Sequence, residues 1–254
     1  MKPKLFITRQ LPGKAIEKLG EYYDVEVWPH YPPPPRDVFL NKAKEADALA
    51  TLLTDKIDCE LISNTPKLRI IAQYAVGYDN IDVECATRYG VYVTNTPGVL
   101  TETVADHTWA LILAISRRIL ESDDYVRKGE WYRSGTGWHP MMMLGYDVHG
   151  KTLGIIGLGR IGSAVARRAK GFNMKVLYYD HRRKLELEKE LGVKYVPLET
   201  LLRESDIVSL HVPLTEETYH MIGEKELKLM KKTAFLINTA RGAVVDTKAL
   251  IKAL

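Results

Sequence analysis

The sequence is poor in cysteine and has no long apolar run. Its 254 residues include two cysteines, Cys59 and Cys85. Two cysteines cannot form the disulfide framework of a small secreted domain, so we expect a reducing compartment. The longest apolar stretch, Trp109 to Ile115, is far shorter than the roughly 20 residues that a membrane helix needs. The start has only a short apolar run before Arg9, which does not match a signal peptide. We therefore expect a cytoplasmic protein with no membrane partner.

The sequence also lacks a strong charge of one sign. Lys and Arg total 36 and Asp and Glu total 32, a net charge of +4, so we expect no nucleic-acid partner. Hydrophobic residues make up 46% and charged residues 27%, which are ordinary values for a globular protein. Glutamine is confined to Gln10 and Gln73; with abundant Lys, Arg and Glu, this favours a heat-adapted source. The length corresponds to roughly 1.7 domains of ordinary size.

Short apolar runs alternate with amphipathic segments along the chain. In the first half we expect strands at 5–7, 25–28, 48–53, 69–73 and 91–93, and helices at 12–20, 36–44, 58–63 and 82–89. In the second half we expect strands at 152–156, 175–179, 207–210 and 234–237, and helices at 161–171, 185–191, 224–230 and 247–254. This alternation predicts an α/β fold with two doubly wound parallel sheets.

Two segments separate these halves. A helix expected over 101–121 is apolar on most faces between Val104 and Ile115, so we expect it to be buried, as a core helix or between two domains. The stretch 130–150 is rich in Gly, Trp and Met. A subunit interface and a folded-back loop both fit that composition.

A glycine-rich segment connects a predicted strand to a predicted helix. It consists of Gly157, Leu158, Gly159, Arg160, Ile161 and Gly162. Together with the acid Asp180 at the end of the next strand, it forms the G-x-G-x-x-G fingerprint of dinucleotide binding. The first glycine permits the tight turn, the second lets the backbone approach the pyrophosphate, and the third lets the helix pack against the sheet. A glycine turn without a ligand is the alternative.

The residues around the acid bear on which dinucleotide binds. Asp180 can accept hydrogen bonds from the ribose hydroxyls, which favours NAD as the cofactor. Arg182 and Arg183 follow His181, and arginines here can instead hold the 2′-phosphate of NADP. A solvated surface turn is the other reading of the two arginines. We expect NAD, with NADP left open, and include His181 and Arg182 in the cofactor site.

Five sequence blocks together resemble a known family. They are QYAVGYDNI at 73–81, TNTPG at 94–98, the glycine motif, HVPLT at 211–215 and INTARGAVVD at 237–246. In this order they resemble the D-isomer-specific 2-hydroxyacid dehydrogenases, and among them the archaeal glyoxylate reductases. The resemblance implies hydride transfer between NAD(P)H and a small 2-keto acid such as glyoxylate, or the corresponding 2-hydroxy acid. It also implies a homodimer and no metal.

The resemblance implies that different parts of the chain form a substrate domain and a cofactor domain. Residues 1–100 match a flavodoxin-like substrate domain, 101–150 an interdomain helix and loop, and 151–254 a Rossmann dinucleotide-binding domain that is incomplete at its C-terminal end. The resemblance also implies roles for single residues.

Arg241 matches the catalytic arginine, whose planar guanidinium suits a carboxylate. Val76 and Gly77 match the loop whose N–H groups receive the carboxylate, and Leu53 and Trp138 match residues near the substrate or in packing. The cofactor side further includes His211, Val212, Pro213, Thr239, Ala240 and Arg241.

The sequence departs from the family pattern in one respect. The family's general acid is a histidine in a Pro-His motif well downstream of the Arg-Gly segment, paired with a glutamate between them. Neither block precedes Leu254, and none of the seven histidines occupies the expected position. Because loss of a general acid typically costs roughly 10²- to 10⁴-fold in rate, we expect impaired turnover. A non-catalytic dinucleotide-binding protein and a truncated remnant are the alternatives.

Overall fold

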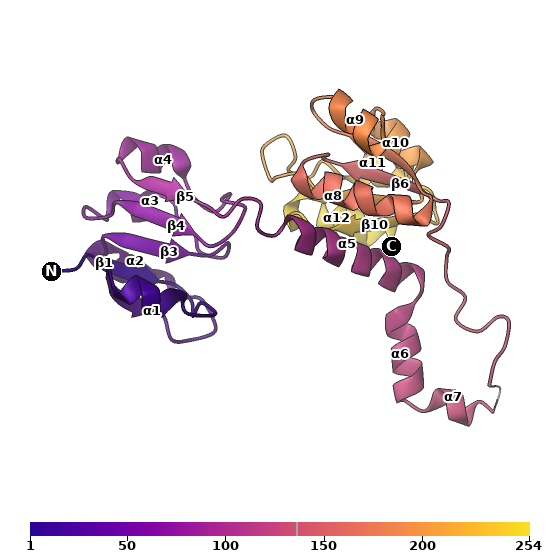
Figure 1. Ribbon diagram of the computed structural model, residues 1–254, viewed down its shortest axis with the longest axis horizontal. Coiled ribbons are helices and arrows are strands. Elements are labelled where there is room, and N and C mark those ends of the chain that lie inside the picture. The colour runs from indigo at the N-terminus through magenta and orange to yellow at the C-terminus, as the bar shows by residue number, and fades with distance from the viewer. Residues whose placement is uncertain (136) are drawn as a thin grey trace. The chain divides into compact units, whose positions relative to one another are not determined.

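The computed structural model describes residues 1–135 and 137–254, which form two compact units, Met1–Val99 and Leu100–Leu254 (Figure 1). Each unit contains a five-stranded sheet whose paired strands are all parallel. The predicted α/β class is therefore confirmed.

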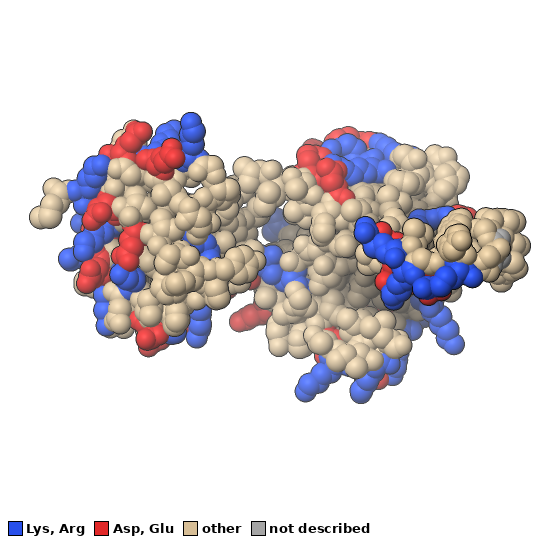
Figure 2. All heavy atoms as spheres, turned by 90° about the horizontal axis from the view of Figure 1, so that it is seen from below, with Lys and Arg blue, Asp and Glu red and all other residues tan. Residues whose placement is uncertain are grey.

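Among the described residues, no helix has both the length and the apolar character that crossing a membrane requires. Basic and acidic side chains are interspersed over the face shown in Figure 2.

The first unit has the strand order β2-β1-β3-β4-β5. Its strands are β1 (Lys4–Ile7), β2 (Asp24–Val27), β3 (Ala48–Thr51), β4 (Ile70–Gln73) and β5 (Tyr92–Thr94), and its helices are α1 (Ala15–Gly20), α2 (Arg36–Glu45), α3 (Cys59–Ser63) and α4 (Val83–Arg88). Residues of α2, α3 and α4 pack on one face of the sheet around Leu49 and Ile71, while α1 packs on the other face against Leu5 and Ile7. Because apolar residues cover both faces, the three inner strands β1, β3 and β4 are mostly apolar, whereas the edge strand β2 alternates polar and apolar residues.

The second unit has the strand order β10-β9-β6-β7-β8. Its strands are β6 (Thr152–Ile156), β7 (Lys175–Tyr179), β8 (Lys194–Tyr195), β9 (Ile207–Leu210) and β10 (Phe235–Asn238). Its helices are α5 (Thr101–Ser116), α6 (Ile119–Arg127), α7 (Glu130–Arg133), α8 (Arg160–Ala169), α9 (Leu185–Leu191), α10 (Leu198–Glu204), α11 (Glu224–Leu229) and α12 (Thr247–Ala253). Helices α5, α8 and α9 contribute to the core on one face of the sheet, and α10, α11 and α12 to the core on the other.

The expected helix over 101–121 is two helices. It breaks after Ser116, where Arg118 adopts a left-handed conformation with φ 54° before α6 begins. Only one side of α5 is buried, through residues such as Trp109 and Ile112, while Ile115 is 48% exposed. Within its own unit α5 is therefore buried on one side, because the sheet covers one side of a helix only; burial of its other faces stays a prediction. Strand β8 was not predicted, because its two residues are too few to carry a pattern. Helix α10 was also missed, although Leu198, Leu201 and Leu202 have the spacing of one helix face.

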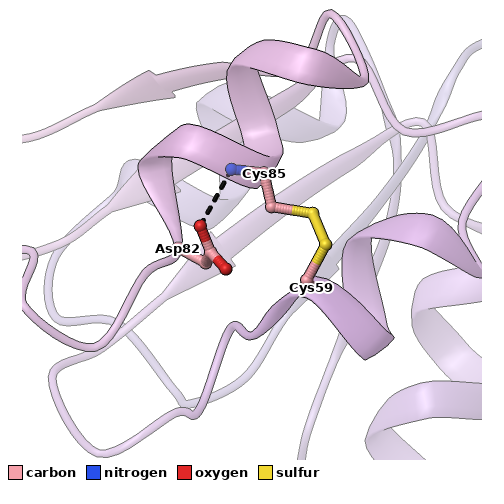
Figure 3. Close-up of side chains that lie close together, drawn as sticks. All are labelled: Cys59, Asp82 and Cys85. Atoms are coloured by element: carbon pink, nitrogen blue, oxygen red, sulfur yellow. Dashed lines mark hydrogen bonds between the residues drawn. A yellow bond between two sulfur atoms is a disulfide. The ribbon is translucent and has the colours of Figure 1, made fainter.

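The two cysteines form a disulfide, a pairing that their number did not predict. Cys59 in α3 is bonded to Cys85 in α4, and their Cα atoms are 5.5 Å apart (Figure 3). Asp82 caps α4 by accepting a hydrogen bond of 2.8 Å from the Cys85 amide. The bond joins two helices of five and six residues, which are too short to be stable alone. Counting cysteines could not show this pairing, because the fold brings together positions 26 residues apart.

We expect reduction of the disulfide to lower the stability of the first unit. Closing a loop of 26 residues stabilises the folded state by about 3.5 kcal/mol in the chain-entropy model. Urea unfolding with and without dithiothreitol measures the difference. The double variant Cys59→Ala/Cys85→Ala is the control, because its midpoint should not respond to the dithiol. Equal midpoints for the oxidised and reduced wild type would contradict this expectation.

Candidate cofactor and substrate site

The glycine motif lies at the carboxyl end of the central strand of the second unit. β6 ends at Ile156, Gly157 turns the chain with φ +94°, and α8 begins at Arg160 with Gly159 as its N-cap. This is the strand–turn–helix context that the spacing predicts. The ten residues of α8 direct its first free N–H groups and the positive end of its dipole toward the turn, an arrangement that favours a bound phosphate.

The three motif glycines are needed for different reasons. A Cβ at Gly157 would lie 2.7 Å from the His211 carbonyl oxygen, so this position requires glycine for space as well as for its positive φ. A Cβ at Gly162 would collide with the Gly157 carbonyl, so glycine here permits close contact between α8 and the turn. A Cβ at Gly159 would meet nothing within 4 Å. Packing within the protein therefore does not require glycine at position 159, and the space above this residue is open to a ligand.

The carboxylate of Asp180 joins the end of β7 to the glycine turn. This side chain is 7% exposed, and its Oδ2 accepts a hydrogen bond of 3.0 Å from the Leu158 amide. Its Oδ1 accepts a bond of 3.3 Å from the Arg182 amide and lies 2.7 Å from Nδ1 of His181. Two carboxylate oxygens offer about four acceptor sites, so Asp180 can still accept bonds from a ribose. The side chains of His181 and Arg182 are exposed.

His211 follows β9 and is locked to the central strand. Its amide donates a bond of 2.8 Å to the Ile156 carbonyl, and its Nε2 shares a bond of 2.9 Å with the hydroxyl of Ser209. Burial lowers the pKa of His211 to about 4, so the ring is neutral near pH 7. Val212 is half-buried and Pro213 exposed. These residues lie at the carboxyl edge of the sheet, where doubly wound folds bind ligands.

Asn238 shapes the segment that carries Arg241. Its Oδ1 accepts a bond of 3.0 Å from the Ala240 amide, and its Nδ2 donates one of 2.8 Å to the Arg241 carbonyl. The guanidinium of Arg241 donates through Nη1 to the Ala240 carbonyl at 3.0 Å. Thr239 shares a hydroxyl bond of 3.0 Å with Thr108 of α5. Asn238 is not among the site residues predicted from the sequence, although an amide side chain three residues before Arg241 was the available signal.

Val76 and Gly77 lie in a loop of the first unit that follows β4 and is held by side-chain amides. Gln73 donates to the Gly77 carbonyl at 3.3 Å, and Asn95 donates to the Val76 carbonyl at 2.8 Å. The backbone N–H groups of Val76 and Gly77 donate to no acceptor within the described part of the chain. Val76 is 36% exposed. Two such N–H groups in a fixed loop can bind an anion.

A buried polar network supports this loop. Gln73 accepts a bond of 2.8 Å from the Thr51 hydroxyl and donates one of 2.7 Å to Oδ1 of Asn80. Asn80 in turn donates to the carbonyls of Leu52 and Asp55 at 3.1 and 2.7 Å. The network therefore holds the loop to the end of β4, and the side-chain amides of Gln73 and Asn80 both have hydrogen-bond partners.

The two remaining predicted substrate residues are both exposed. Leu53 follows β3 in the first unit and is 44% exposed, and Trp138 follows α7 in the second unit and is 74% exposed. Packing does not account for side chains this exposed, so each is free to meet a ligand or another chain.

The residues of the second unit fit a dinucleotide. The protein leaves open space above Gly159, and the N-terminus of α8 beside it is suited to a pyrophosphate. Asp180 supplies an acceptor at the end of the neighbouring strand, as a ribose requires.

Comparisons with known proteins agree with this geometry. Residues 109–254 match the family model described as "D-isomer specific 2-hydroxyacid dehydrogenase, NAD binding domain". The chain is 65% identical to the glyoxylate reductase of Aeropyrum pernix over 100% of this chain and 76% of that protein. It is also 65% identical to the glyoxylate reductase of Thermococcus litoralis, over 100% of this chain and 77% of that protein. The crystal structure of Aquifex aeolicus D-lactate dehydrogenase with NAD and lactic acid has a TM-score of 0.85 and 38% identity, covering 98% of this chain and 72% of that one.

We expect alanine to separate the structural glycine of the motif from the ligand-facing one. Gly162→Ala should lower stability by roughly 1–3 kcal/mol, because the added methyl group overpacks α8 against the turn. Gly159→Ala should leave the thermal midpoint near that of the wild type and weaken NADH binding, because its methyl group enters open space. Thermal unfolding and fluorescence titration with NADH measure the two effects. Loss of stability in Gly159→Ala with unchanged NADH affinity would contradict this assignment.

Proposed function

The chain belongs to the D-isomer specific 2-hydroxyacid dehydrogenase family, and we propose that it reduces glyoxylate with NADH as the preferred hydride donor. Its reaction class is hydride transfer between NAD(P)H and a 2-keto acid. Glyoxylate is proposed because the relatives that are 65% identical are glyoxylate reductases. One observation carries the proposal. The glycine turn after β6, with Asp180 bonded to it, and the segment of Arg241 after β10 both follow strands of the same sheet, since β9 pairs with both β6 and β10.

Residues of the second unit are proposed to hold the cofactor. The turn from Gly157 to Gly162 and the start of α8 receive the pyrophosphate, and Asp180 accepts the ribose hydroxyls. The negative charge of Asp180 disfavours a 2′-phosphate, which supports NAD over NADP. The remaining proposed cofactor contacts lie at the edge of the sheet and beside the acid: His181, Arg182, His211, Val212, Pro213, Thr239, Ala240 and Arg241.

Two kinds of group are proposed to recognise the substrate. The N–H groups of Val76 and Gly77, which have no acceptor among the described residues, are suited to a carboxylate, and Leu53 and Trp138 are proposed as apolar contacts. Arg241 is proposed as the catalytic residue, because its guanidinium binds a carboxylate and stabilises negative charge developing on the carbonyl oxygen. The bound nicotinamide supplies the hydride for reduction or accepts it for oxidation. On this proposal Met1–Val99 serves the substrate, and Leu100–Leu254 holds the cofactor and supplies Arg241 and Trp138 to the substrate.

A cytoplasmic location is part of the proposal. The disulfide does not oppose it, because heat-adapted organisms keep disulfides in intracellular proteins. The composition that favours a heat-adapted source, with Gln confined to two positions, supports this reading.

We expect Arg241→Lys to lower kcat and raise KM for glyoxylate, because an ammonium group cannot reproduce the two-pronged bond to a carboxylate. The loss in kcat/KM should be on the order of 10- to 100-fold, the equivalent of one or two strong hydrogen bonds. Absorbance at the NADH band follows the reaction. Arg203→Lys is the control, because Arg203 is an exposed residue of α10.

The same assay tests the proposed function itself. NADH consumption should depend on added glyoxylate and on protein concentration. Binding of NADH without turnover of glyoxylate or another small 2-keto acid would favour a non-catalytic dinucleotide-binding protein. Unchanged kinetics in Arg241→Lys would remove Arg241 from the catalytic role.

We also propose that the protein is a homodimer that pairs through α6, α7 and the following loop. These elements expose large apolar side chains, including Leu120 at 78%, Val126 at 56% and Tyr132 at 90%. Exposed apolar groups in such number are typical of an interface between protein chains. In Figure 1, α6 and α7 extend away from the sheet of their own unit, which leaves their faces free for a second copy.

We expect the double variant Leu120→Asp/Val126→Asp to be monomeric, because a buried carboxylate without a partner is strongly unfavourable at an interface. Light scattering coupled to size-exclusion chromatography measures the mass of each species. Ile251→Asp, which adds a carboxylate at an exposed position of α12, should leave the mass at that of the wild type. A monomeric wild type at micromolar concentration would refute the proposed dimer.

A further inference from the structure

The turn after Asp180 carries two arginines, and the structure treats them differently. Arg183 forms a two-pronged ion pair with Glu188 of α9, with Nε to Oε1 at 2.8 Å and Nη2 to Oε2 at 2.8 Å. Arg182 is exposed, and among the described residues its guanidinium has no ion-pair partner. Of these two adjacent arginines, Arg183 is therefore engaged in an ion pair, whereas Arg182 has none with the described residues.

Glu188 is itself held in place by a buried phenol. Oε1 of Glu188 accepts a bond of 2.7 Å from the hydroxyl of Tyr178, which accepts one of 2.8 Å from the Lys184 amide. The ring of Tyr178 is fully buried. The bonds from Arg183 and Tyr178 lower the pKa of Glu188 to about 2, so its carboxylate is ionised throughout the neutral range.

The ring of Tyr195 in β8 adds a second contact to Arg183. The guanidinium carbon lies 6.0 Å from the centre of that ring, within the range of a cation–π contact. Tyr195 packs edge-on against Tyr178 at 5.4 Å between ring centres. Arg183 is therefore held by a carboxylate and an aromatic ring that are both fixed to the sheet.

A 2′-phosphate is the one chemical difference between NADP and NAD, and its recognition requires arginine donors that are free to form paired bonds. Resting on the proposed function, which places the adenosine ribose at Asp180, we propose that Glu188 is a specificity-determining positioning residue. Its ion pair with Arg183 occupies the guanidinium, which is then not available to bind the 2′-phosphate of NADP. Glu188 thereby adds to the preference for NAD that the charge of Asp180 sets. Glu188 acts through Arg183, and it contacts neither the reacting atoms nor the substrate.

Removing the carboxylate of Glu188 should therefore shift cofactor preference. We expect Glu188→Gln and Glu188→Ala to lower the ratio of the NADPH dissociation constant to the NADH dissociation constant by about tenfold, the effect of one additional charge-assisted hydrogen bond to the 2′-phosphate. The affinity for NADH should change little. Fluorescence titration of the protein with each nucleotide, without substrate, measures the ratio independently of turnover.

Two further variants separate a specificity role from a structural one. Glu186→Gln is the matched control, because Glu186 is an exposed carboxylate in the same helix; its ratio should equal that of the wild type. Arg183→Ala added to Glu188→Ala should cancel the rise in NADPH affinity, because the freed cation is then absent. A merely structural role for Glu188 would alter both affinities together and leave their ratio unchanged.

The outcomes distinguish this inference from the function on which it rests. A wild type that binds neither NADH nor NADPH would overturn the proposed function. Normal NADH binding in both Glu188 variants with the wild-type ratio would overturn the role of Glu188 alone. If Glu188→Ala unfolds, Glu188→Gln, which can keep the bond to the Tyr178 hydroxyl, decides the matter by the same ratio.

Discussion

The structure of the second unit depends on the carboxylate of Asp180 at the end of β7. One of its oxygens accepts from the Leu158 amide in the glycine turn, and the other accepts from the Arg182 amide in the next turn. A buried carboxylate is costly unless hydrogen bonds satisfy it, so both turns are obliged to approach it. The same group thereby orders the backbone on both sides and leaves acceptor capacity for a ribose.

Close packing of the neighbouring segments follows from that arrangement. α8 can begin directly above the turn only because position 162 has no side chain, and the turn can lie against the chain after β9 only because position 157 has none. The open space above Gly159 remains after these contacts are made. A rigid backbone that leaves space for the ligand is the physical requirement for binding in a preformed site.

The two units use different means to hold their functional loops. In the first unit, side-chain amides of Gln73 and Asn80 fix the loop of Val76 and Gly77, whose backbone N–H groups have no acceptor among the residues that the structure describes. In the second, the Asn238 side chain accepts a bond from the Ala240 amide and donates one to the Arg241 carbonyl, and so fixes the backbone that carries Arg241. In each case neutral amides act as the scaffold, since they can donate and accept at once without adding charge near an anionic substrate.

The sequence by itself determined most of the strands, the glycine turn and the acid after β7. These features depend on local periodicity and on residue types at fixed spacing, which one stretch of chain contains in full. Only the tertiary structure decided the Cys59–Cys85 bond, the exposed side of α5 and the engagement of Arg183 by Glu188. Each of these depends on distances between side chains that the folded backbone sets. The pattern of residues at 180–183 allowed either dinucleotide, whereas the folded turn shows that only one of its two arginines is free of an ion pair within the described residues.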